Sequence, residues 1–270
     1  MGYQLLAWIA GMVAIACAGR WAMRRSRRRR LLAAPMPGGW VEILERSLPP
    51  YRALSDAERQ RLHGAIQIFL DEKTFEGCDG LTLNDDIRVT IAAQACLLLL
   101  NRNVPVYPRL RTVLVYPDTY VARDGDGSRS VRLGESWGRG VVVLAWNSVQ
   151  GGAANFDDGQ NVTLHEFAHQ LDQEDGVADG APVLGAQSAY RTWAGVLSRE
   201  YKALQRRSGK GRRTVIDPYG ATHPAEFFAV ATEAFFEKPR QLSRKHPDLY
   251  RELKGYYATD PLGWEDAAGA

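Results

Sequence analysis

The chain has 270 residues, of which 45% are hydrophobic, enough for one sizeable globular core. Seven of the 34 Lys and Arg residues are arginines among the first 30 positions, where no acid occurs. The rest of the chain is therefore net acidic, and the overall net charge of +3 comes from the N-terminal arginines. This balance argues against general nucleic-acid binding, which needs a basic folded surface, and the three cysteines indicate reduced thiols rather than a disulfide framework.

The N-terminal segment is an uncharged apolar run followed by arginines. Residues 2–19 carry no charge, and the arginines from Arg20 to Arg30 follow directly. About 18 apolar residues is near the lower limit for crossing roughly 30 Å of hydrocarbon, and a basic cluster stays on the cytoplasmic side. We therefore expect residues 1–23 to form a hydrophobic membrane-anchor helix that tethers the protein to the cytoplasmic face of the inner membrane. The alternatives are a cleaved signal peptide, which normally has its positive charge first, and an in-plane helix held by anionic lipid.

A linker and two helices are predicted next. The Arg-rich and Pro/Gly-rich residues 24–39 are predicted to form a linker, and residues 40–270 the globular domain. Ser55 and Glu58 have the spacing of a capping box, which predicts a helix that continues to about residue 72. Residues 88–100 are predicted to form a second, largely buried helix.

The second half of the chain combines short strands with helices. Runs rich in β-branched residues predict strands at residues 111–116, 130–134 and 141–146, and the pattern is mostly helical from about residue 160. The fold class is therefore predicted to be α+β, mostly helical, with a small mixed sheet. Two interpretations of residues 141–146 stay open: an edge strand that pairs with an extended substrate, or a core strand.

The most informative motif is His-Glu-x-x-His, formed by His165, Glu166 and His169. On a helix, side chains four positions apart project from the same face, so both imidazoles can reach one ion. Catalytic zinc takes three protein ligands and a water, and a glutamate beside the first histidine can accept a proton from that water. We predict Zn²⁺ on His165 and His169, with Glu166 as the general base. A metal site kept without catalysis is the alternative.

The third ligand has to come from a distant segment, because the Gly-x-x-His continuation that some zinc peptidases use is missing after His169. Farther along, Pro224 suits the first turn of a helix. Glu226, Glu233 and Glu237 then share one stripe among apolar residues. Buried carboxylates need partners, and a zinc ion with two histidine ligands is one. Spacing alone leaves both Glu226 and Glu233 as candidates.

Several motifs resemble the Mlc titration factor A (MtfA) family of bacterial zinc metallopeptidases and, more remotely, the catalytic domain of anthrax lethal factor. The resemblance covers about residues 28–262, and its motifs are Phe75 to Cys78, Arg88 to Cys96, His165 to Asp172 and Asp217 to Ala229. It implies a zincin-like metallopeptidase domain. It also implies that Glu226 completes the zinc site of His165 and His169, and that Tyr219 faces the metal.

Other residues near the motifs have predicted supporting roles. Tyr219 suits a phenolic donor to the oxyanion of a tetrahedral intermediate, and a tyrosine packed beside a turn is its alternative. Asp172 and Glu233 are candidates to accept the second N–H of the histidine ligands. His223 is expected to cap a helix or to lie on the surface.

Two classes of function remain. The first is a zinc-dependent peptidase that acts on a peptide or protein substrate, with the choice between aminopeptidase and endopeptidase open. The second is a regulatory binding protein with a dormant metal site, because members of the resembled family are linked to glucose uptake through sequestration of the transcriptional repressor Mlc. Sequestration has no need of Glu166, so the intact motif favours the peptidase. An Mlc-like repressor and a membrane, but no nucleic acid, are the further expected partners.

Overall fold

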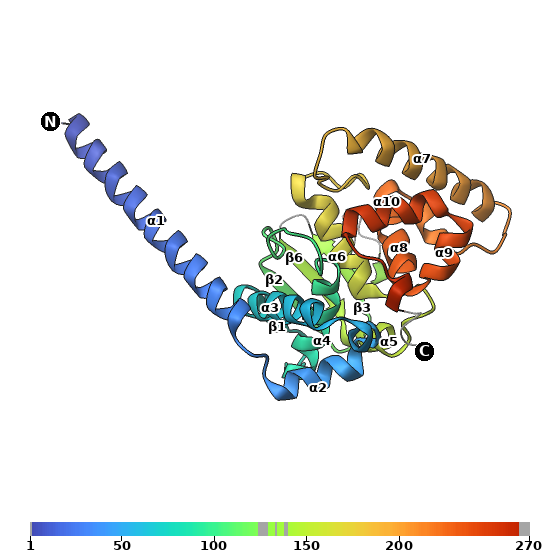
Figure 1. The fold of residues 1–270 in the computed structure, drawn as a ribbon, viewed down its shortest axis with the longest axis horizontal. Coiled ribbons are helices and arrows are strands. Elements are labelled where there is room, and N and C mark those ends of the chain that lie inside the picture. Colours follow the sequence, from blue (N-terminus) through green and yellow to red (C-terminus); the bar gives the residue numbers. More distant parts are fainter. Residues whose placement is uncertain (1, 124–128, 133, 138–139, 265–270) are drawn as a thin grey trace.

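A computed structural model describes residues 2–123, 129–132, 134–137 and 140–264 (Figure 1). Helices dominate these residues: α1 Gly2–Ala33, α2 Gly38–Ser47, α3 Asp56–Glu72, α4 Asp85–Leu97, α5 Trp146–Ala154, α6 Val162–Asp172, α7 Ala189–Ser208, α8 Pro224–Glu237, α9 Pro239–Lys245 and α10 Pro247–Tyr257. Short 3₁₀ segments are η1 Pro49–Ala53, η2 Gln173–Asp175 and η3 Pro218–Ala221. The strands are β1 Thr74–Gly77, β2 Thr112–Tyr116, β3 Tyr120–Arg123, β4 Arg129–Arg132, β5 Gly134–Trp137 and β6 Val141–Ala145.

The main sheet is small and mixed, with strand order β1-β2-β6-β5. β1, β2 and β6 run parallel, and β5 is antiparallel to β6. This confirms the predicted α+β class. β6 is an interior strand, because Val143 pairs with Leu114 on one side and with Glu135 on the other. Of the two interpretations of residues 141–146, the core strand is therefore confirmed and the edge strand is wrong, and β5 forms this edge of the sheet as far as the structure describes it.

The two predicted helices on either side of β1 are confirmed. α3 begins with the capping box, in which the Glu58 N–H donates to Ser55 Oγ and the Ser55 N–H donates to Glu58 Oε2. α4 begins three residues earlier than predicted, because the side-chain oxygen of Asn84 accepts the N–H of Ile87 and caps the helix there. Most of α4 is buried, as expected for its apolar sequence. The predicted strand at residues 130–134 falls on β4 and the start of β5, and position 133 lies outside the described residues.

The arginine-rich segment is helical and packs against α3. The predicted linker began at residue 24, but α1 continues to Ala33 and only residues 34–37 separate it from α2. Arg24 and Arg28, one helical turn apart, each donate to Glu72 at 2.8 Å, and Arg27 pairs with Asp71. Ion pairs with two acids of α3 thus add to the packing of this helical segment on α3, a contact that its composition did not indicate.

The N-terminal half of α1 extends away from the rest of the protein (Figure 1). Its apolar side chains include Trp8, Met12 and Ile15, all strongly exposed. Among the residues that the structure describes, no helix combines the length and apolar character required to cross a bilayer.

The core holds α6 in place from one side. Phe167, in the middle of α6, is fully buried, and its ring contacts those of Phe69 and Tyr107 at centroid separations of 5.6 and 4.9 Å. Such aromatic contacts contribute about 0.5–1.5 kcal/mol each beyond burial itself. The opposite face of α6 packs against α8. The His-Glu-x-x-His helix is therefore fixed between the core and α8.

The contact between α1 and α3 predicts a local effect of Glu72→Gln. Partial burial raises the pKa of Glu72, but hydrogen bonds from Arg28 and Arg24 outweigh it and lower the pKa to about 2. The contact is therefore present above pH 4.5 and lost as the pH falls through about 2. At pH 7 we expect Glu72→Gln to raise amide hydrogen exchange of residues 24–33 by about fivefold, since an exposed ion pair contributes at most about 1 kcal/mol.

The matched control is Glu76→Gln, which changes an exposed carboxylate on β1. It should leave the exchange of residues 24–33 unchanged. Equal exchange in native protein and Glu72→Gln would show that the ion pairs do not hold α1.

Candidate metal centre

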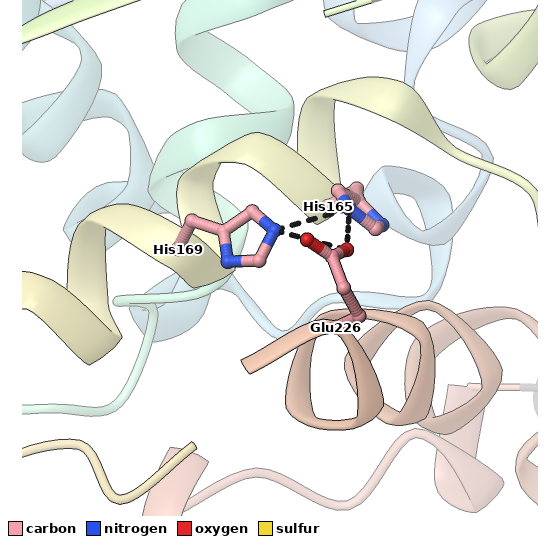
Figure 2. A group of neighbouring side chains, drawn as sticks. All are labelled: His165, His169 and Glu226. Carbon is pink, nitrogen blue, oxygen red and sulfur yellow. Dashed lines mark hydrogen bonds and ion pairs between the residues drawn. The ribbon is translucent and has the colours of Figure 1, made fainter. Parts of the chain in front are cut away.

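The centre is built on the face of α6 that points to α8. Asn161 begins α6 by accepting the N–H of Leu164 on its side-chain oxygen. His165 and His169 then project from one face, and Glu226, in the first turn of α8, points between them (Figure 2). The three side chains form a group whose ligand atoms all lie within 4.8 Å of one another. Residues 61 positions apart in the sequence thus share one site.

The separations of the three donor atoms fit a single small cation. Nε2 of His165 lies 3.2 Å from Nε2 of His169, and Oε2 of Glu226 lies 3.0 Å from the first and 3.3 Å from the second. Around a tetrahedral ion with bonds of about 2.0–2.2 Å, neighbouring donor atoms are roughly 3.3 Å apart. The three atoms therefore have the spacing of three corners of such a tetrahedron.

The electrostatics of the group also favour a cation. Burial lowers the pKa of the His165 imidazole, but hydrogen bonds to Glu226 and Glu233 outweigh burial and hold that pKa well above its ordinary value. Burial likewise raises the pKa of Glu226, yet its contacts with the two imidazoles hold that pKa far below its ordinary value. A positive charge at this point is thus stabilised by the surrounding carboxylates, and a metal ion supplies such a charge without a proton.

The structure separates the two carboxylates that spacing left as equal candidates. Glu226 faces the Nε2 atoms of both imidazoles, whereas Glu233 Oε1 accepts from Nδ1 of His165 at 2.8 Å, on the far side of the ring. With Nδ1 donating to Glu233, the lone pair of Nε2 is directed at the point where the other donors converge. Glu226 is therefore the carboxylate that lies with the two Nε2 atoms, and Glu233 bonds to the opposite side of the His165 ring.

Glu166 and Tyr219 both lie near His165. Glu166 is buried on α6, and its negative charge contributes to the raised pKa of His165. Tyr219 lies on η3, where its backbone N–H donates to the side chain of Asp217, and its ring centroid is 6.2 Å from that of His165. Its side chain is 55% exposed, so the centre is open to solvent on this side.

The remaining predicted residues have structural partners. His223 caps α8, where its Nδ1 accepts the N–H of Ala225, as expected. Asp172 accepts the N–H of Gly180 instead of supporting His169, and burial raises its pKa to about 6. Sequence reasoning missed Asn161, which bonds to the carboxylates of α8. Its place directly before an apolar helical pattern was a capping signal, but it gave no indication of those contacts.

The chain was compared with known proteins. The model of a family described as "Glucose-regulated metallo-peptidase M90" matches residues 22–258. An uncharacterized protein of Synechocystis sp. is 45% identical over 245 residues, 87% of this chain and 89% of that protein. Proteins named Mlc titration factor A are 34% identical in Pectobacterium atrosepticum, over 80% of this chain and 84% of theirs, and 31% identical in Escherichia coli, over 83% and 86%.

The close packing of η3 on α8 predicts a strict requirement for Gly220. A Cβ at Gly220 would collide with Val230 and approach Cα of Phe227 to 3.2 Å. We expect Gly220→Ala to displace η3 and to lower the free energy of unfolding by about 1–3 kcal/mol. Gly195→Ala is the control, because nothing lies within 4 Å of that position in α7, and it should raise stability by up to about 1 kcal/mol. Chemical denaturation measures both, and equal behaviour would refute the close contact.

Proposed function

Because this chain belongs to the glucose-regulated metallopeptidase M90 family, we propose that it is a zinc-dependent peptidase that hydrolyses peptide bonds. The observation that carries this proposal is the convergence of His165 Nε2, His169 Nε2 and Glu226 Oε2 at tetrahedral spacing beside the buried Glu166. Two imidazoles and one carboxylate suit zinc in catalytic sites, which keep a fourth position for water. A purely structural zinc site would more commonly include cysteine thiolates among its ligands.

Each residue has a distinct role in the proposed reaction. His165, His169 and Glu226 hold the zinc ion, which when bound acidifies a water and polarises the substrate carbonyl. Glu166 accepts the proton of the attacking water and passes it to the leaving amine. The Tyr219 phenol donates a hydrogen bond to the oxygen on which negative charge develops. The exposed side of Tyr219 is where the substrate enters.

The sheet offers a place for the main chain of the substrate. β5 lies at the edge of the sheet and packs against α6. An extended peptide that adds to an edge strand is held by backbone hydrogen bonds, which give affinity with little dependence on sequence. This assignment moves the proposed substrate strand from β6, whose two sides are paired, to β5.

Repressor binding is a second candidate function, and the names of the relatives support it. The proteins named Mlc titration factor A match this chain over more than four-fifths of their own length. Binding of an Mlc-like repressor would couple the chain to the control of sugar uptake. One fold can hold both activities, because a partner surface need not include the metal centre.

Variants of Glu166 and Tyr219 test the peptidase. We expect Glu166→Ala to keep about one zinc per chain and to lower kcat for a peptide by about 10²–10⁴-fold, since it removes the base and leaves the ligands. Tyr219→Phe should lower kcat by about 10²–10³-fold, the effect of losing one oxyanion donor. Elemental analysis and peptide hydrolysis measure the two quantities.

Glu76→Ala and Tyr201→Phe are the matched controls, because Glu76 is exposed on β1 and Tyr201 packs against Phe227 from α7. Both should retain native hydrolysis. Zinc in the native protein without hydrolysis of any peptide would reject the peptidase and favour the repressor-binding function. Native protein without zinc would reject the metal centre.

We also infer that the protein works at the inner face of a membrane, where α1 contacts anionic lipid. Trp8, Met12 and Ile15 expose apolar surface that contact with lipid would remove from water. Arg24, Arg27 and Arg28 pair with acids of α3, and the other arginines of the segment, Arg20, Arg25, Arg29 and Arg30, are exposed and lie outside these pairs. Each arginine near an anionic surface contributes about 1 kcal/mol.

Vesicle co-sedimentation of the full chain tests this location. We expect binding to phosphatidylglycerol vesicles that falls at least tenfold in the double variant Met12→Glu/Ile15→Glu, since a carboxylate in the hydrocarbon costs about 2.5–3.5 kcal/mol. The control is Val177→Glu, which changes an exposed apolar side chain elsewhere and should bind as native. Failure of native protein to sediment with anionic vesicles would reject the lipid contact.

A further inference from the structure

Asn161 links the start of α6 to α8 through several hydrogen bonds. It is 1% exposed. Its side-chain oxygen caps α6, and its Nδ2 donates to the carbonyl of Gly152 at 3.3 Å and to Oε1 of Glu237 at 3.0 Å. Its backbone N–H donates to Oε2 of Glu233 at 2.5 Å. One residue therefore contacts both buried carboxylates in the last two turns of α8.

Glu233 accepts two N–H donors, one on each oxygen. Oε1 receives Nδ1–H of His165, and Oε2 receives the N–H of Asn161. A carboxylate satisfies both donors, whereas an amide would have to turn its NH₂ group toward one of them. Glu233 thus binds the imidazole of His165 with one oxygen and the first residue before α6, Asn161, with the other.

Glu237 completes the connection one turn farther along α8. Its oxygens accept from Asn161 Nδ2 and from the backbone N–H of Gln160, and its side chain is buried. Burial, together with the charge of Glu233, raises the pKa of Glu237 to about 8, although the hydrogen bond from Asn161 lowers it.

We propose that Asn161, together with Glu233 and Glu237, is a positioning unit that fixes the imidazole of His165 and the first turn of α6 in ligand geometry before a metal ion arrives. The proposal rests on the proposed function in taking His165 as a ligand. Outer partners of metal ligands contribute about 10–100-fold to metal affinity. The side chain of Asn161 caps α6 and bonds to Glu237 and to Gly152, and its backbone N–H bonds to Glu233, so it is a positioning residue that acts through these groups.

The surroundings of Asn161 separate this role from ordinary helix capping. Asn84 provides the comparison within the same chain, because its side chain caps α4 with the same bond to the N–H three residues along. Gly152 leaves just enough space for the amide of Asn161, because a Cβ there would lie 2.9–3.2 Å from its side-chain atoms. The neighbouring backbone is therefore fitted to this amide.

Metal affinity of three variants tests the unit. Asn161→Ser keeps a capping oxygen but removes Nδ2, and Gly152→Ala displaces the intact amide. Competition with a chelator should show that each weakens zinc binding by about 10–100-fold, and the visible spectrum of the Co²⁺-loaded protein should change. Asn84→Ser, with the same substitution at the cap of α4, should bind zinc as native. Native affinity and Co²⁺ spectrum in Asn161→Ser and Gly152→Ala would overturn the proposal.

A metal-free measurement separates this proposal from the proposed function. In chelator-treated native protein we expect the Nδ1–H proton of His165 to be protected from solvent exchange in ¹⁵N-resolved NMR, and the protection to be lost in Glu233→Ala, which removes the acceptor. A protected proton in a protein that binds no zinc would reject the peptidase and keep the positioning unit. Zinc binding with an unprotected proton in native protein would reject the positioning unit and keep the peptidase.

Discussion

The contact between α6 and α8 places the imidazole of His165 between two carboxylates, and the rest of the centre depends on it. Glu226 lies at Nε2 and Glu233 at Nδ1, so both ring nitrogens are engaged by one helix. This arrangement fixes the orientation of the ring and directs its lone pair at the point where His169 also converges. On the other side of α6, Phe167 packs against the rings of Phe69 and Tyr107, and this contact holds α6 in its position next to α8.

Burying several acids together is costly, and the protein limits that cost in three ways. Glu226 faces two imidazoles, which favour its charged form. Glu233 receives two N–H donors, and Glu237 has its pKa raised to about 8 so that it is largely neutral near pH 7. Such a cluster of perturbed groups is typical of functional sites, where charge is arranged for chemistry rather than for stability.

Several local features were predictable from the sequence because a few neighbouring residues encode them. The capping box of α3 and the spacing of His165 and His169 depend only on helical periodicity. The resemblance to a metallopeptidase family was confirmed by the family match. It also led to the prediction of Glu226 as the third ligand, which spacing could not separate from Glu233. The helical arginine segment was missed, because it packs on α3 and pairs with Asp71 and Glu72, which are more than 40 residues away in the sequence.

The sequence by itself determined the class of the fold, the helix that carries both histidines and the family. The tertiary structure alone decided which nitrogen of His165 each carboxylate faces, that β6 is interior, and that Asn161 joins the start of α6 to α8. The physical reason is range. Helix periodicity and caps act within one or two turns, whereas these contacts depend on how helices and strands separated by tens of residues pack against one another.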